Sequence, residues 1–333
     1  MLNNWIKPYQ STRPLENGSI KIVSNSNQNP VEKINENSLV FLSAGGKRSS
    51  LVKDSLAEFQ NYFEELEIID LGFFQKEDAT FNTQLFQDFK HGKITSLILD
   101  KDLVWFSEIM HGLKTINPKT RNICISNKIY FSEFGIPTDF IGFQRHLVPL
   151  MHLQRIHDYS INSMSLGKLR ADSDLLEPIM RDAQNVYFDI GAIRKSDAPG
   201  SYDSMSSGLT CEEACQIFKY LGGNAMLNNV VIGGNFECDD LTALCIAELI
   251  WYFFEGRSSI IHDHPSIDQN YKEYLVEIES LKDTFSFIKN DRSGRWWFKI
   301  NENEDYVSCS RNEYQQASND ELPDRLLKHY TSL

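Results

Sequence analysis

Short apolar runs recur between residues 38 and 232, and segments with helical periodicity separate most of them. In the segment 51–66, Val52, Leu56, Phe59 and Phe63 fall at spacings of four, three and four, which places them on one face of a helix. Apolar strands that alternate with amphipathic helices are typical of a parallel sheet covered on both faces. The runs that predict strands are 38–43, 67–71, 96–99, 122–125, 140–143, 186–190 and 230–232.

Two later helices carry start signals in the sequence. Thr210 with Glu213 three positions on has the pattern of a capping box. Asp239 opens a long apolar segment that stops at Gly256, as expected for a capped helix. In a parallel α/β sheet the functional crevice lies beyond the carboxyl ends of the strands, so the residues that follow each apolar run are the first candidates for a site.

The sequence after Gly256 is more polar. It predicts a connector and a helix over 257–284, an aromatic strand over Ser293–Ile300 and one short helix around Pro323–Tyr330. The length of 333 residues fits one large α/β domain or two ordinary ones. We expect an N-terminal arm at 1–37, an α/β domain at 38–300 and a C-terminal extension, 301–333, packed on that domain.

Charge and hydropathy restrict the partners. The net charge of −13 disfavours both nucleic-acid backbones and anionic membrane surfaces. No segment approaches the roughly 18–20 apolar residues that a membrane span needs. The start, MLNNWIKPYQ, lacks the basic and apolar pattern of a signal peptide. We therefore expect a cytoplasmic protein without membrane insertion or nucleic-acid binding.

The chain has six cysteines and no CxxC pair. Cys211 and Cys215 are spaced to share one helix face. Free cysteine is commonly buried as a small hydrophobe, so we expect these thiols to be reduced and packed in the core.

Two motifs point to a known family. The segment Phe188–Gly200, FDIGAIRKSDAPG, and the segment Gly208–Glu213, GLTCEE, resemble the arginase, agmatinase and formimidoylglutamase (ureohydrolase) family. The ending RSGRWWFKI with YVSCS at Tyr306–Ser310 resembles a formimidoylglutamase-like branch of Bacteroidetes type. The resemblance implies a three-layer α/β/α fold with a central parallel sheet of about eight strands, and assembly into homo-oligomers.

The family's chemistry, by this resemblance, uses two manganese ions that activate a water for attack on a guanidinium-type carbon. Aspartates and histidines that follow three strands hold the metals. Of the aligned positions, only Asp189 keeps the family's ligand residue. Lysines, Lys101 and Lys128, stand at the two histidine positions, and a protonated lysine has no lone pair to offer a metal. The aligned ligand positions here are Lys101, Ser126, Lys128, Tyr130, Asp189 and Gly191.

The positions around these residues suggest what became of the pocket. One hypothesis is that Lys101, Lys128 and Arg194 fill the former metal pocket against Asp189; the other is that some of them face solvent and the pocket has collapsed. The further residues that we expect to border the degenerate pocket are Asp100, Asp102, Asn127 and Arg194.

The sequence supports two functional hypotheses. The first is a catalytically inactive homologue, with no cofactor and no catalytic residue, that serves in protein binding, scaffolding or regulation. The second is a manganese-dependent amidinohydrolase that acts on formimidoylglutamate or a related guanidino or amidine substrate.

Trp296 and Trp297 are adjacent on a predicted strand, so their side chains face opposite ways. One of them is a candidate contact for a protein partner.

Overall fold

The computed structural model describes residues 6–7, 23–24, 34, 38–43, 47–63, 66–74, 79–91, 93–114, 120–131, 138–159, 161–300 and 305–331. Most of the expected N-terminal arm, 1–37, lies outside these residues. Two short strands of that segment, β1 (Ile6–Lys7) and β2 (Val23–Ser24), both pair with β4, the first antiparallel and the second parallel.

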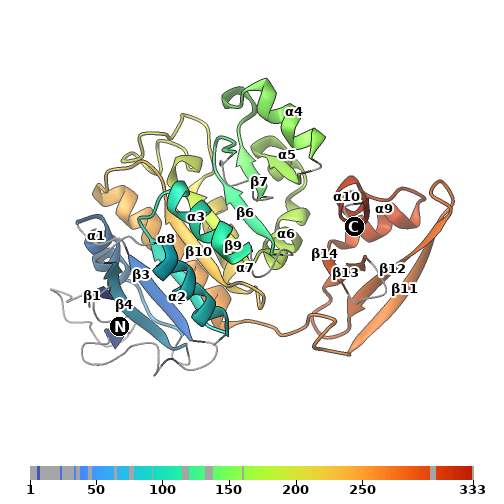
Figure 1. The fold of residues 1–333 in the computed structure, drawn as a ribbon, viewed down its shortest axis with the longest axis horizontal. Coiled ribbons are helices and arrows are strands. Elements are labelled where there is room, and N and C mark those ends of the chain that lie inside the picture. Colours follow the sequence, from blue (N-terminus) through green and yellow to red (C-terminus); the bar gives the residue numbers. More distant parts are fainter. Residues whose placement is uncertain are drawn as a thin grey trace.

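A parallel sheet forms the centre of the described molecule (Figure 1). Eight strands of the described chain run parallel in the spatial order β4-β3-β5-β10-β9-β6-β7-β8. Their bounds are β3 Leu39–Ser43, β4 Ile68–Phe74, β5 Thr95–Leu99, β6 Asn122–Ile125, β7 Thr138–Phe143, β8 Ser163–Ser165, β9 Asn185–Asp189 and β10 Asn229–Gly233.

Helices cover both faces of this sheet, because alternate strand residues are apolar toward both sides. Leu39 and Phe41 of β3 pack in one hydrophobic cluster and Val40 and Leu42 in the other. The predicted three-layer α/β/α fold is confirmed. On the first face lie α1 Lys47–Leu56, α5 Leu166–Ala171, α6 Leu176–Asp182, α7 Cys211–Gly222 and α8 Asp240–Ser258, and on the second α2 Ala79–His91, α3 Leu103–Lys114 and α4 Leu150–Asp158.

The element boundaries differ from the prediction at two places. Helix α1 begins at Lys47 and ends at Leu56, so Phe59 and Phe63 pack on the core from beyond the helix. Strand β8, Ser163–Ser165, was not predicted, because its sequence SMS contains no apolar run. The two helix starts that were predicted are confirmed: Thr210 and Glu213 form a capping box on α7, and Asp239 caps α8.

The C-terminal part of the chain forms a second, antiparallel sheet to the side of the first (Figure 1). Its four strands lie in the order β11-β12-β13-β14, and the helices α9 and α10 pack with them around a separate apolar cluster. The bounds are β11 Tyr271–Ile278, β12 Asp283–Asn290, β13 Trp296–Lys299, β14 Tyr306–Cys309, α9 Arg311–Ser318 and α10 Asp324–Thr331.

The predicted helix within 257–284 is wrong, because β11 and the first residues of β12 occupy that region. Strand β11 buries Val276 and Ile278 but exposes Glu277 and Leu275. A strand with one solvated face carries so few apolar residues that its pattern is easily taken for a polar helix. The boundary that we expected at residue 300 falls between β13 and β14 of this sheet.

Both tryptophans of β13 are buried, so the prediction of an exposed tryptophan for a protein partner is wrong. Trp296 is 7% exposed and stacks on Tyr314 with ring centroids 4.4 Å apart. Trp297 is 1% exposed and faces the other side of the sheet. The guanidinium carbon of Arg181 in α6 lies 4.3 Å from the centre of the Trp297 ring. The two side chains do face opposite ways, but each face is covered.

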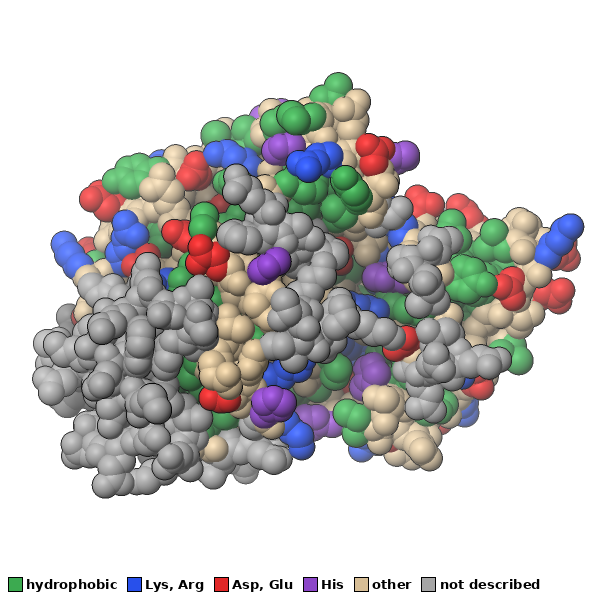
Figure 2. Space-filling view, in the orientation of Figure 1, with side chains coloured by type: hydrophobic (Ala, Val, Ile, Leu, Met, Phe, Trp, Pro, Cys, Tyr) green, Lys and Arg blue, Asp and Glu red, His purple; other side chains and the backbone are tan. Residues whose placement is uncertain are grey.

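Partly buried polar contacts join the two sheets. Asp182, at the end of α6, accepts hydrogen bonds from Arg121 Nη1 (2.6 Å) and from the backbone N–H of Ser308 in β14 (2.9 and 3.1 Å to its two oxygens). On the face seen in Figure 2, acidic and basic side chains are interspersed among the described residues. None of the helices in the described ranges is long and apolar enough to cross a membrane.

Candidate functional site

The residues predicted from the family resemblance lie around the carboxyl ends of β5, β6 and β9. We use the name strand-end site for Lys101, Ser126, Lys128, Tyr130, Asp189 and Gly191. Strands β6 and β9 are neighbours in register, so Ser126, just after β6, and Asp189, the last residue of β9, come side by side. The loop 190–210 then folds back over these strand ends before α7 begins.

Asp189 is 4% exposed, and neutral groups satisfy both of its carboxylate oxygens. The Ser126 hydroxyl donates to Oδ2 at 2.9 Å, and the backbone N–H of Gly191 donates to Oδ1 at 2.8 Å. Burial raises the pKa of Asp189, and the hydrogen bonds from Gly191 and Ser126 only partly offset that shift. Asp189 is thus held as a structural acceptor that starts the short turn Ile190–Ala192.

Lys128 pairs with a residue that the sequence did not single out. Its Nζ lies 2.8 Å from Asp203 Oδ1, and both side chains are about a third exposed (31% and 30%). Asn127, fully buried beside it, donates from Nδ2 to the Asp203 backbone oxygen at 2.7 Å. Lys128 and Asp203 have opposite electrostatic effects on Asp189, Lys128 lowering its pKa and Asp203 raising it. Nothing local in the loop sequence marks Asp203 as the partner.

The other predicted cations do not converge on Asp189. Arg194 is partly exposed and pairs with Asp197, with Nε 2.8 Å from Oδ1. Lys101 is buried, and its ammonium lies 5.4 Å from the centre of the Trp105 ring. The structure therefore brings one of the three cations, Lys128, close enough to influence Asp189, and even that one is bonded elsewhere.

The remaining predicted residues have local roles. Asp100 has a positive φ of 64° and accepts a hydrogen bond from Arg48 Nη1 at 3.0 Å. Asp102 accepts from the Trp105 N–H at 2.8 Å and so caps the first turn of α3. Tyr130 has a pKa well above its ordinary value because it is buried and close to the carboxylates of Asp189 and Asp203.

An open cleft of about 770 Å³ lies beside the strand-end site, between the start of α1 and the loops that follow β5, β9 and β10. Arg48, Asp100, Tyr202 and Glu237 are among the residues that line it. The Arg48 guanidinium also lies 5.0 Å from the centre of the Phe236 ring. Charged groups of both signs therefore face the cleft, at the end of the sheet where ligands bind in parallel α/β proteins.

Solved structures share this architecture. A manganese-loaded formiminoglutamase from Trypanosoma cruzi is similar over 68% of this chain and 95% of its own, with a TM-score of 0.58 and 12% identity. The formimidoylglutamase of Bacillus subtilis is similar over 68% of this chain and 88% of its own (TM-score 0.56, 14% identity). The fold is arginase-like.

More distant similarity points the same way. The agmatine ureohydrolase of Thermoplasma volcanium is similar over 67% of this chain and 90% of its own, with a TM-score of 0.51 and 12% identity. No protein-family model and no curated protein sequence matches this chain. At such identities the comparison establishes the fold, and the activity has to be judged from the residues at the site.

The residues at the strand ends do not fit a pair of manganese ions. Within the described chain, no three histidine, cysteine, aspartate or glutamate ligand atoms converge there. Gly191 has little room for a carboxylate, because a Cβ would lie 3.0 Å from both Asp189 Oδ1 and Asp203 Cβ. At Gly234, where φ is +121°, a Cβ would lie 2.4 Å from Asp189 Oδ1. The Asp189 carboxylate thus occupies the space beside both glycines.

Proposed function

We propose that this chain is a catalytically inactive protein with an arginase-like fold, and that it acts by binding a partner or ligand rather than by amidine hydrolysis. The observation that carries the proposal is the closed set of hydrogen bonds around Asp189. The one retained ligand residue already accepts from Ser126 and Gly191, and the ammonium of Lys128 stands in the same site, bonded to Asp203.

Charge supports the proposal as much as ligand count does. A divalent ion about 4 Å from an ammonium is repelled by roughly 8 kcal/mol at an effective dielectric constant of 20. One ionised carboxylate at the same distance would only cancel this repulsion. Asp189 is moreover shifted toward its neutral form, since burial raises its pKa. Asp203 balances the charge of Lys128, so Asp189 is the single carboxylate of the strand-end site left to attract Mn²⁺.

The binding role is assigned to the cleft beside the strand-end site. It is open, and Arg48, Asp100 and Glu237 offer it both signs of charge. Such a lining suits a partner that is itself zwitterionic, such as an amino-acid-like molecule or a mixed-charge protein surface. A protein partner or a second copy of this chain, as expected from the family resemblance, are both compatible with this surface.

The experiment uses the full chain, purified with and without added Mn²⁺. Bound manganese is measured, and turnover of formimidoylglutamate, agmatine and arginine is assayed. We expect no stoichiometric manganese and no turnover in either preparation. Thermal shifts with the same three compounds then test binding: a rise in melting temperature in the wild-type chain that Arg48→Ala abolishes would support the cleft as the binding surface.

Manganese at one or two equivalents together with turnover would overturn the proposal, provided that Asp189→Asn abolishes both. That variant is the matched control, because Asn keeps the shape and the acceptor for Gly191 but removes the ligand charge. Such a result would restore the hypothesis of a manganese-dependent hydrolase with a non-standard site.

A further inference from the structure

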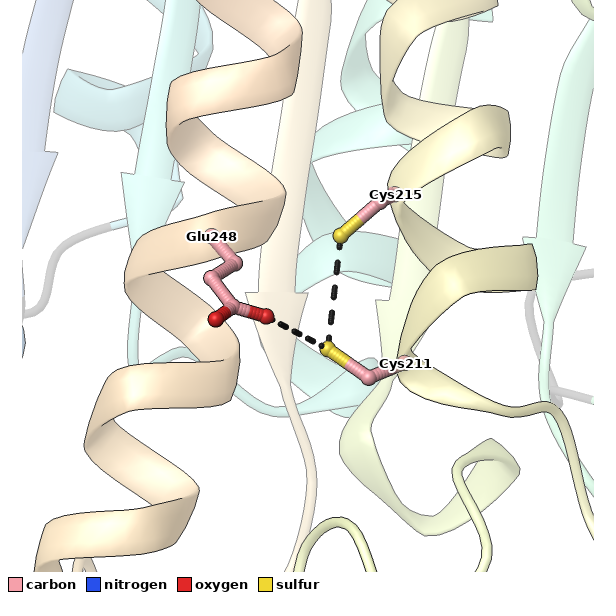
Figure 3. Close-up of side chains that lie close together, drawn as sticks. All are labelled: Cys211, Cys215 and Glu248. Atoms are coloured by element: carbon pink, nitrogen blue, oxygen red, sulfur yellow. Dashed lines mark hydrogen bonds between the residues drawn. The ribbon is translucent and has the colours of Figure 1, made fainter.

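A second group of chemically reactive side chains lies away from the strand-end site, between helices α7 and α8 (Figure 3). Cys211 and Cys215 come from the first two turns of α7 and face α8, which contributes the other members. We use the name thiol cluster for Cys211, Cys215, Cys245 and Glu248.

Cys211 is the hub of the thiol cluster. Its Sγ lies 4.0 Å from Cys215 Sγ, accepts from Cys245 Sγ–H at 3.2 Å and donates to Glu248 Oε2 at 3.1 Å. Ligand atoms around one tetrahedral zinc ion, with Zn–S near 2.3 Å and Zn–O near 2.0–2.2 Å, stand about 3.5–3.8 Å apart. The ligand atoms of Cys211, Cys215 and Glu248 all lie within 4.8 Å of one another, so modest side-chain rotations place these three around a common centre. Cys245, whose Sγ lies 3.2 Å from Cys211 Sγ, adjoins this group.

The helix packing fixes this arrangement. Farther along the two helices, a Cβ at Gly222 would lie 2.1 Å from the Phe253 carbonyl oxygen, and a Cβ at Gly256 would lie 2.1 Å from the Lys219 carbonyl oxygen. The two backbones are therefore in direct contact through glycines. With the helices held this close, the i,i+4 pair on α7 faces the i,i+3 pair on α8.

Burial and access suit a bound ion. Cys215 and Cys245 are 5% and 4% exposed, whereas Cys211 and Glu248 are half-buried. The cluster is thus enclosed on the core side and reachable from solvent on the other. In the described residues it is also the one place where three or more cysteine, histidine or carboxylate ligand atoms converge, since the atoms of Cys211, Cys215 and Glu248 all lie within 4.8 Å of one another.

We propose that the thiol cluster binds one thiophilic divalent cation of the zinc type, held by the thiolates of Cys211 and Cys215 and the carboxylate of Glu248, with Cys245 next to the site. Soft sulfur ligands in tetrahedral arrangement select such ions over Mn²⁺ or Mg²⁺. The cation replaces the protons of the two thiols that bind it, and these protons leave to solvent. The site is separate from the strand-end site and does not depend on the function proposed for it.

The four side chains of the thiol cluster shift one another's pKa. The neighbouring thiols hydrogen-bond to Cys211 and lower its pKa, whereas those contacts and burial raise the pKa of Cys215 and of Cys245. Burial, and then the contact with Cys211, raises the pKa of Glu248 to about 7. The shift at Cys211 favours a thiolate ligand, whereas the shifts at Cys215, Cys245 and Glu248 mean that these groups release their protons only when a cation replaces them.

The test titrates the reduced full-length chain with Co²⁺, whose sulfur-to-metal charge-transfer absorption reports thiolate ligands. We expect one Co²⁺ per chain, displaced by Zn²⁺, with weaker binding at lower pH. Cys211→Ser should weaken binding at least about 100-fold, because even loss of a residue that only supports a ligand costs 10–100-fold. Cys238→Ser, a half-buried cysteine outside the cluster, is the matched control and should bind like the wild type.

Glu248→Gln provides a second variant in case the serine variant fails to fold, since it keeps the side-chain shape and removes only the charged ligand. Absence of the charge-transfer band in the reduced wild type would overturn the proposal, as would equal Co²⁺ affinity in Cys211→Ser. A Cys211–Cys245 disulfide that forms in air, with no cobalt spectrum after reduction, would also overturn it and assign the pair to redox chemistry instead. Metal at the strand-end site would survive Cys211→Ser and show no sulfur band, so the two proposals fail independently.

Discussion

Two buried carboxylates of the same sheet show how differently one local motif can be completed. Asp70 in β4 and Asp189 in β9 are each followed two residues later by a glycine whose N–H donates to Oδ1 at 2.8 Å. Asp70 also receives the Lys53 ammonium of α1, at 2.9 and 2.8 Å to its two oxygens, and both partners are almost fully buried. Asp189 receives only the Ser126 hydroxyl.

The two sites have the same aspartate–glycine motif, so the presence or absence of a bonded cation determines whether the buried carboxylate is charge-compensated. At Asp70 an ammonium compensates the charge inside the protein, and the pair becomes part of the core. At Asp189 no cation is bonded directly, and burial leaves the carboxylate with a raised pKa. In a metalloenzyme of this fold a metal would supply that charge; here the position is closed by neutral donors.

The largest effect is expected from a substitution that breaks the buried ion pair between Lys53 and Asp70. Asp70→Ala leaves the Lys53 ammonium buried without its carboxylate, and we expect it to lower the free energy of unfolding by about 3–5 kcal/mol. Urea denaturation measures the change. The double variant Lys53→Met with Asp70→Leu should recover most of it, because a buried ion pair can be replaced by packed apolar groups. A loss below about 1 kcal/mol in the single variant would show that the pair is not effectively buried.

An intermediate effect is expected at the second carboxylate. Ser126→Ala removes the hydroxyl donor to Asp189 Oδ2 and should lower the free energy of unfolding by about 1–3 kcal/mol. Ser49→Ala is the matched control, because the buried Ser49 hydroxyl has no hydrogen-bond partner in the described structure and its loss should be nearly neutral. Equal effects of the two substitutions would mean that the hydrogen bond to Asp189 contributes nothing.

The smallest effect is expected in how the ionisation of Asp189 changes the stability of the protein with pH. The folded-state pKa of Asp189 is raised, so the folded protein binds this proton more tightly than the unfolded chain does. Wild-type stability should therefore fall relative to Asp189→Asn as pH rises from the ordinary value of 3.8 through the folded pKa, and the two should converge at lower pH. At neutral pH we expect a difference within about 1 kcal/mol, in favour of the variant.

Unfolding midpoints of both proteins in acidic and neutral buffer measure this difference. The opposite trend, with the wild type gaining on Asp189→Asn as pH rises, would mean that a cation stabilises the ionised carboxylate. That outcome would also weaken the case against a metal at the strand-end site.

Sequence reasoning located most strands of the parallel sheet, because their residues are apolar on both faces and stand out as continuous runs. It could not locate β8, whose three residues include only one buried apolar side chain, or β11, whose exposed face is charged. Those strands exist because a neighbouring strand and the core position them. The local amino-acid composition of these segments therefore does not predict that they form strands.

At the site, the sequence indicated which residues follow the strands but not what they contact. Lys128 was expected to face Asp189, and its bonded partner is Asp203, brought over by the loop after β9. Arg194 was grouped with it and instead points to Asp197. The sequence predicted only part of the thiol cluster, because the spacing of Cys211 and Cys215 indicated a shared helix face. Their approach to Cys245 and Glu248 depends on the glycine contacts between α7 and α8.

The bond between Asp182 and the Ser308 N–H has a consequence for how the protein is made. It joins residues 126 positions apart: Asp182 belongs to the main α/β layer, and Ser308 belongs to β14, the last strand of the described chain. During translation the ribosome still holds β14 when α6 is already free to fold. Until that strand emerges, Asp182 has its Arg121 partner within the α/β domain but not yet the Ser308 N–H, so this edge of the domain is completed only when synthesis of the C-terminal sheet ends.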